Sequence, residues 1–94
     1  PGIEQIIREE FSFFGLNVDQ AISVGTCESG LRSDATNLNR NGSVDRGVFQ
    51  WNSDAHPAIT DDMAFDPRAS ARLAAVQVLR SGWGAWNASR RCWQ

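Results

Sequence analysis

Two acidic residues, Glu28 and Asp45, are placed so that they could do chemistry together. Glu28 begins the motif Glu28-Ser29-Gly30, where a helix is predicted to end, and Asp45 follows a predicted hairpin. Acid-catalysed cleavage of a glycosidic bond needs two carboxyl groups in unlike surroundings, one protonated and one ionised. We therefore interpret Glu28 and Asp45 as a candidate catalytic pair.

The surroundings predicted for Glu28 favour a carboxyl group that keeps its proton. Glu28 continues the apolar stripe of its helix, because Val24 and Ala21 lie one and two turns before it. It also lies in the last turn, where the helix dipole disfavours negative charge. Burial and the dipole both raise the pKa of a carboxyl group, which would make Glu28 a general acid. The alternative is an ordinary surface glutamate near a helix end.

Asp45 is predicted to lie on a polar, partly hydrated strand and to stay ionised. It could then stabilise a positively charged sugar ring or attack it. Gly47, two residues later, would let substrate or backbone approach closely. The alternative is a turn aspartate that pairs with Arg46 or Arg40.

Amide and indole side chains could form the walls of a sugar site. Gln50 alternates with Phe49 and Trp51 along the chain, so in an extended segment Gln50 and Asn52 would share a face. Amides suit the N-acetyl and hydroxyl groups of amino sugars. The chain has four tryptophans; we expect two in the core and two, Trp83 and Trp86, at the site.

Other chemistries are less well supported. Cys27 and His56 could form a thiol nucleophile and its base, but Cys27 lies within a predicted helix and nothing orients His56. One histidine and two remote cysteines lack the spacing of a metal site, and Asp61, Asp62 and Asp66 do not match a calcium loop. We expect no metal and no cofactor.

The elements around these residues predict an α+β fold that is predominantly helical, with a small β-hairpin. Residues 3–14 have helical spacing, and a second helix begins at Asn17 or Asp19 and ends before Gly30. Asn41-Gly42 predicts a two-residue hairpin turn between 38–40 and 43–45.

The C-terminal half is predicted to be helical as well. Residues 53–65 should form loop and short helical turns, a third helix should run from Asp66-Pro67 to Ser81, and a short helix or turn should follow. In the third helix we expect Ala69, Leu73, Val76 and Leu79 to face inward, and Arg68, Arg72 and Arg80 to face solvent.

The length and the net charge indicate a single domain and argue against a nucleic-acid-binding or membrane-spanning protein. Ninety-four residues make one domain, spanning residues 1–94. A net charge of −2, with nine arginines and no lysine, argues against nucleic-acid binding, and no apolar run is long enough for a membrane span. The chain begins at Pro1 without a visible signal peptide, so we expect a monomeric domain cut from a longer protein that encodes its export elsewhere.

Cys27 and Cys92 lie far apart in the chain. A bridge between them would stabilise the fold by about 4 kcal/mol through loop entropy. Two reduced thiols packed as small apolar side chains are the alternative.

With these residues identified, a family resemblance becomes visible. The segment from Glu28 to Asn52, ESGLRSDATNLNRNGSVDRGVFQWN, closely resembles the active-site segment of c-type lysozymes. It is also similar to the lysozyme-like lytic transglycosylases of bacteria and phages. The tail GWGAWNASRRC resembles the tryptophan-containing segment beside the catalytic acid. Lysozymes are the type case of two differently tuned carboxylates.

The resemblance implies a role for each matching residue. Glu28 would be the general acid, and Asp45 the nucleophile or electrostatic stabiliser. The groove asparagine corresponds to Asn52, with Gln50 and Asn39 lining the same region. Trp83 matches the tryptophan beside the acid better than Trp86 does.

Three functions follow from the resemblance. The first is a muramidase, which hydrolyses the bond between N-acetylmuramic acid and N-acetylglucosamine in peptidoglycan. The second is a lytic transglycosylase that uses Glu28 alone and leaves anhydro-muramic ends. The third is an inactive wall-binding or phage structural module. The protein would act at the bacterial cell wall, secreted, periplasmic or phage-delivered. A separate wall-binding domain would compensate for the negative net charge of this one.

The chain also departs from c-type lysozymes, which are longer, basic and held by four disulfides. Its β region beyond Asn52 is much shorter.

Overall fold

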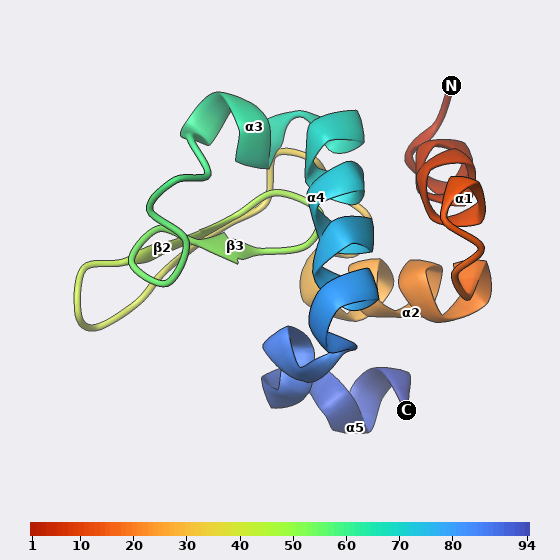
Figure 1. Ribbon diagram of the computed structural model, residues 1–94. Coiled ribbons are helices and arrows are strands. Elements are labelled where there is room, and N and C mark those ends of the chain that lie inside the picture. Colours follow the sequence, from red (N-terminus) through yellow and green to blue (C-terminus); the bar gives the residue numbers. More distant parts are fainter.

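The computed structural model describes all residues from 1 to 94. The fold is α+β and predominantly helical, as predicted (Figure 1). Its elements in chain order are α1 (Ile3–Phe13), α2 (Val18–Ser29), β1 (Thr36–Leu38), β2 (Val44–Arg46), β3 (Trp51–Asn52), α3 (Asp61–Phe65), α4 (Pro67–Ser81), the 3-10 helix η1 (Gly84–Ser89) and α5 (Arg90–Trp93).

Helices α1, α2, α4 and α5 form one side of the molecule, and the sheet projects from the other with α3 next to it (Figure 1). Helix α4 runs through the middle of the view with α1 packed along it, and α2 packs against α1. The chain then returns through η1 and α5, which pack against α2. None of the helices combines the length and the hydropathy that a membrane span requires.

The helix ends lie where the capping residues predict them. Asn17 accepts a hydrogen bond from the Gln20 backbone N–H at 3.0 Å at the start of α2. Gly30 ends this helix in the left-handed conformation, with a φ of 64°. Asp66 caps α4 by accepting from the Ala69 N–H at 2.7 Å.

The hairpin differs from its prediction. The sheet has the order β1-β2-β3 and is antiparallel, and Leu38 pairs with Val44. Residues 39–43 therefore form the loop between the two strands. The prediction of a two-residue turn at Asn41-Gly42 is wrong. The reason is local: the Asn41 side chain accepts hydrogen bonds from the N–H and the hydroxyl of Ser43, which closes a turn before strand pairing can begin.

The buried face of α4 also differs from its prediction. Its buried residues are Ser70, Ala71, Ala74 and Ala75, whereas Ala69, Leu73 and Val76 are only partly buried and Leu79 is 57% exposed. Small side chains let α4 lie close to its neighbours, so packing selects this face rather than the larger apolar one.

The core of the domain lies between the helices and the segment before β3. The largest fully buried apolar side chains are Phe11, Phe49, Ile7, Val24 and Val48.

Two of the arginines expected in solvent join α1 to α4. Arg68 and Arg72 both bind Glu10, each with a contact of 2.8 Å, and Arg68 also binds Glu9 at 2.8 Å. The hydrogen bond from Arg72 is the main reason why the pKa of Glu10 is below its ordinary value. Arg80 is exposed, as predicted, and it makes no ion pair.

A disulfide links the second helix to the C-terminal helix. Cys27 and Cys92 are bonded, with their Cα atoms 6.0 Å apart, and the bond ties α2 to α5. Helix α5 buries none of its residues. Near the bridge, the Gln20 side chain donates to the Trp93 carbonyl at 3.3 Å.

Candidate active site

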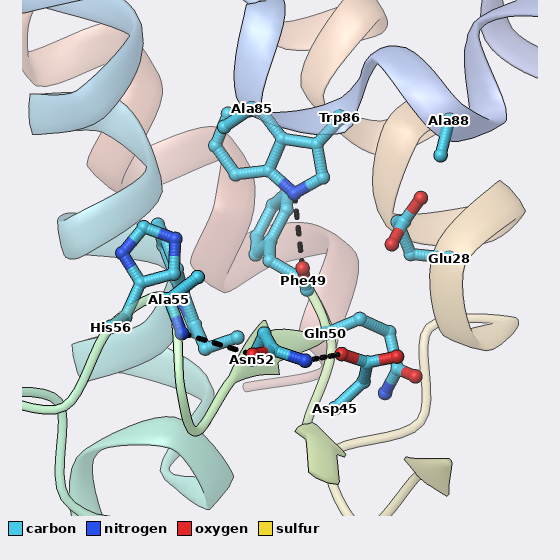
Figure 2. Close-up of a pocket in the computed structure, with 11 residues that line it drawn as sticks. Glu28, Asp45, Phe49, Gln50, Asn52, Ala55, His56, Ala85, Trp86 and Ala88 are labelled. Atoms are coloured by element: carbon cyan, nitrogen blue, oxygen red, sulfur yellow. Dashed lines mark hydrogen bonds between the residues drawn. The ribbon is translucent and has the colours of Figure 1, made fainter. Parts of the chain in front are cut away.

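A cavity of about 210 Å³ lies between the end of α2, the sheet and η1, and both candidate carboxylates face it (Figure 2). The end of α2 and η1 are far apart in the sequence, and the fold brings both to this cavity. The lining residues are Glu28, Asp45, Phe49, Gln50, Trp51, Asn52, Ala55, His56, Ala85, Trp86 and Ala88.

Glu28 lies in the last turn of α2 and is partly buried. Burial is the main reason why the pKa of this carboxyl group is raised. Hydrogen bonding with Ser89 acts in the opposite direction, and the charge of Asp45 raises the pKa further. The partial negative charge at the C-terminal end of the helix also raises the pKa of Glu28. These surroundings favour a carboxyl group that holds a proton and can donate it.

Asp45 is held by a neighbouring strand. It pairs with Asn52 in the β2–β3 register, and its Oδ1 accepts a hydrogen bond from the Asn52 side-chain amide at 2.8 Å (Figure 2). The alternative of a pair with Arg46 is wrong, because Arg46 points to the other face of the strand. There its Nε donates to the Trp51 carbonyl at 3.0 Å, and Nη1 donates to the Ile59 carbonyl at 2.9 Å.

Gln50 faces the cavity, but the segment around it is a turn. We predicted an extended run over residues 49–52, whereas only Trp51–Asn52 are in a strand and Gln50 has a φ of 56°. The turn begins at Gly47, where a side chain would collide with the Ala64 carbonyl oxygen. The Gln50 amide donates to the carbonyls of Gly47 and Ala35 at 2.9 and 3.2 Å, so much of its hydrogen-bonding capacity serves the turn.

Asn52 is similarly committed within the protein. Besides Asp45, its amide donates to the Ser43 hydroxyl at 3.0 Å, and its Oδ1 accepts from the backbone N–H groups of Asp54 and Ala55, both at 3.0 Å. Each polar atom of this side chain therefore has a partner. The geometry makes Asn52 a residue that positions Asp45.

The structure places Trp86, and not Trp83, at the cavity. Trp86 is 4% exposed, lines the cavity and donates its indole N–H to the Phe49 carbonyl at 3.0 Å. Trp83 lies outside the cavity and stacks on Phe11, with ring centroids 5.9 Å apart. Choosing Trp83 as the residue beside the acid is therefore wrong. The chain enters η1 between the two residues, so their side chains do not share one helical face.

Asn39 also lies outside the cavity lining, contrary to expectation. Its amide donates to the carbonyl and the hydroxyl of Ser43, at 3.2 and 3.1 Å. The hairpin loop folds back on itself, and this keeps Asn39 in the loop.

His56 is a lining residue that the motif did not reveal. Its ring meets Trp51 edge to face, with centroids 4.9 Å apart. Burial, and next the charge of Arg46, lower the pKa of His56, so the ring favours its neutral form. His56 lies in an irregular segment between β3 and α3, where the sequence has no periodic pattern. Only the residue type could have indicated that it belongs to the site. The reading of His56 as a base for Cys27 is wrong, because Cys27 is in the disulfide.

No group of three or more histidine, cysteine, aspartate or glutamate side chains is arranged to hold a metal ion. The arrangement can donate a proton from Glu28 and place the negative charge of Asp45 across the same cavity. Fold and site together define a lysozyme-like class of α+β proteins.

Comparisons with known proteins agree with this class. The family described as "Lysozyme like domain" matches residues 9–88, and the chain belongs to this family. Among solved structures, the lysozyme from Equus asinus is similar, with a TM-score of 0.68 and 21% sequence identity. The match covers 97% of this chain and 86% of that lysozyme, and it shows a shared fold. No match is found among the curated proteins.

Membership places the chain, at the level of the superfamily, with enzymes of the glycosidase and transglycosylase type that act on peptidoglycan in the cell wall.

Proposed function

We propose that this domain is a muramidase that hydrolyses the β-1,4 bond between N-acetylmuramic acid and N-acetylglucosamine. One observation carries the proposal: Glu28 and Asp45 face a single cavity from different elements and in unlike surroundings. Glu28 has a raised pKa because it is buried, whereas Asp45 has a polar partner in Asn52. A proton donor and a separate negative charge are what hydrolysis of a glycoside needs.

In the proposed reaction, Glu28 donates its proton to the bridging oxygen as the bond from the sugar carbon to that oxygen breaks. The electron pair of the bond leaves with the oxygen, and positive charge develops on the sugar ring. Asp45 stabilises that charge or bonds to the ring carbon through Oδ2, because Oδ1 is held by Asn52. Glu28, now ionised, takes a proton from water, and the water oxygen bonds to the sugar carbon. Where Asp45 has bonded to that carbon, this bond breaks and its electron pair returns to Oδ2.

The cavity suits one sugar unit rather than a whole strand. Its volume of about 210 Å³ lies below the 300–1,000 Å³ that is usual for a drug-sized ligand. Phe49 and Trp86 supply apolar walls, and His56 supplies a polar group besides the two carboxyl groups. The remainder of the glycan would lie outside the cavity, over the shortened sheet.

A lytic transglycosylase is the second candidate. It would use Glu28 first as acid and then as base, while a hydroxyl group of the muramic acid closes an anhydro ring. The observation that favours it is the hydrogen bond from Asn52, which partly occupies Asp45. The reaction would then depend on the single carboxyl group whose pKa is raised.

Mass spectrometry of digested peptidoglycan tests the two reactions. Hydrolysis leaves reducing muramic acid ends, and transglycosylation leaves anhydro ends. We expect Glu28→Gln to lower cleavage about 10²- to 10⁴-fold, because the proton donor is lost. Asp45→Asn should abolish hydrolysis, whereas a transglycosylase could survive it. Asp34→Asn is the matched control, since Asp34 is exposed and outside the cavity.

An inactive wall-binding or structural module is the third possibility. If the wild-type domain binds purified walls yet clears no wall suspension under any condition, the enzyme proposal fails. We further propose that the domain works as a monomer at the bacterial wall, with a wall-binding domain elsewhere in its parent protein. Tight binding of the 94-residue chain alone to purified walls would contradict the need for that second domain.

A further inference from the structure

A second hollow, which we call the C-terminal groove, lies on the other side of η1 from the cavity. It has a volume of about 330 Å³ and is lined by Trp83, Gly84, Asn87, Arg90, Trp93 and Gln94. Its position follows from η1, since Ala85, Trp86 and Ala88 face the cavity while Gly84 and Asn87 face the groove. In Figure 1 this region is the blue C-terminal segment below α4.

Several polar groups of the groove have no partner within the protein. The Trp83 indole N–H and the Asn87 side-chain amide make no hydrogen bond within the protein. Arg90 donates from Nε to the Gln94 amide oxygen, and no carboxylate pairs with it. The lining contains no acidic side chain. The groove therefore offers hydrogen-bond donors and an unpaired positive charge.

The apolar part of the groove is held firmly. Trp83 stacks on Phe11 with an interplanar angle of 6°, and its ring centroid is 6.0 Å from that of Trp93. The Trp93 indole N–H donates to the Ser89 hydroxyl at 3.1 Å and to the Trp86 carbonyl at 3.2 Å. Both rings are half-buried, so each keeps some surface exposed without freedom to turn.

We propose that the C-terminal groove binds one acidic N-acetylated sugar unit, such as N-acetylmuramic acid with its lactyl carboxylate. The indole surfaces suit the C–H groups of a sugar ring, and the amides of Asn87 and Gln94 suit an N-acetyl group. The guanidinium of Arg90 suits the carboxylate. The identity of the glycan rests on the proposed function, whereas the chemistry of the ligand rests on the groove.

The groove would give the enzyme a second hold on a glycan strand. It shares η1 with the cavity: Ala85, Trp86 and Ala88 of this helix line the cavity, and Ser89 of the same helix accepts the hydrogen bond from the Trp93 indole of the groove. A strand held in the groove would keep the domain near further bonds to cleave. The gain would appear with polymeric substrate, where two units can bind at once.

The test uses the whole 94-residue chain with the Glu28→Gln substitution, so that no cleavage occurs. The disaccharide of N-acetylglucosamine and N-acetylmuramic acid is titrated while NMR follows the Trp83 indole N–H and the Asn87 amide. His56 and Trp51 report on the cavity separately. The neutral disaccharide of N-acetylglucosamine is the second probe. Arg90→Glu is compared with Arg91→Glu, an equal change of charge at a neighbouring exposed residue outside the groove.

We expect the groove signals to shift with the acidic disaccharide, and its affinity for the groove to fall about tenfold in Arg90→Glu. Arg91→Glu should change this affinity less than about twofold, and neither variant should alter the cavity signals. Groove signals that do not shift would overturn the proposal. So would equal effects of the two arginine variants, or equal affinity for the neutral probe. Groove shifts without cavity shifts would support the groove and count against the proposed function.

Discussion

Removing the bridge between Cys27 and Cys92 tests how Glu28, the proposed general acid, is kept partly buried. The bond joins residues 65 positions apart and holds α5 against α2, next to Glu28. Helix α5 buries none of its residues fully, and its other contacts come mainly from Trp93. The Trp93 indole packs beside Trp83 and donates to Ser89 and the Trp86 carbonyl, and its own carbonyl accepts from Gln20 at 3.3 Å. The disulfide is the covalent link that holds these contacts against α2.

The size of the effect follows from the length of the closed loop. A loop of this length contributes about 4 kcal/mol through chain entropy. In a domain of this size, each kcal/mol corresponds to about 4–8 °C in Tm, so we expect a fall of about 15–30 °C. The assay is thermal unfolding followed by circular dichroism, for the wild type and for the double variant Cys27→Ser, Cys92→Ser.

The same variant should change the pH dependence of cleavage. Loosening η1 and α5 would expose Glu28 to water and lower its pKa toward the ordinary value, because burial is the main cause of the raised pKa. Activity that needs protonated Glu28 should therefore decline at a lower pH in the variant. Reductant should reproduce the change in the wild type and do nothing further in the variant. A fall in Tm of less than about 4 °C, together with an unchanged decline of cleavage activity at high pH, would refute the reasoning.

Three other substitutions test separate parts of the structure. Glu28→Gln should be slightly more stable than the wild type near pH 7, because folding disfavours the charged form of a carboxyl group with a raised pKa. The difference should vanish below the ordinary value of 4.5, where the wild type is protonated in both states, and denaturant titrations at the two pH values measure it. Arg46→Ala should cost about 3 kcal/mol in the same assay, since it leaves two carbonyl groups without their donor, whereas exposed Arg40→Ala should cost less than about 0.5 kcal/mol. Gly47→Ala should cost at least about 2 kcal/mol, because its φ is 78° and the new Cβ would meet the Ala64 carbonyl; an unchanged midpoint would contradict this.

Much of the helical scaffold could be predicted because its signals are local. Asn17, Gly30 and Asp66 act on backbone groups within a few residues, so each cap is visible in the sequence and agrees with the structure. The hairpin was placed less well, because the Asn41 side chain competes with strand pairing inside the same short loop. The buried face of α4 could not be predicted, since small side chains there matter only against a neighbouring helix.

The candidate site divides in the same way. The sequence alone determined that a glutamate lies at a helix end and that an aspartate lies shortly after a hairpin turn, because both positions depend on nearby residues. Tertiary structure decided that Trp86 rather than Trp83 lies beside the cavity, that the amide of Asn52 holds Asp45, and that His56 joins the lining. These facts depend on how α2, the sheet and η1 pack together. Contacts between segments far apart in the chain leave no periodic pattern in either segment.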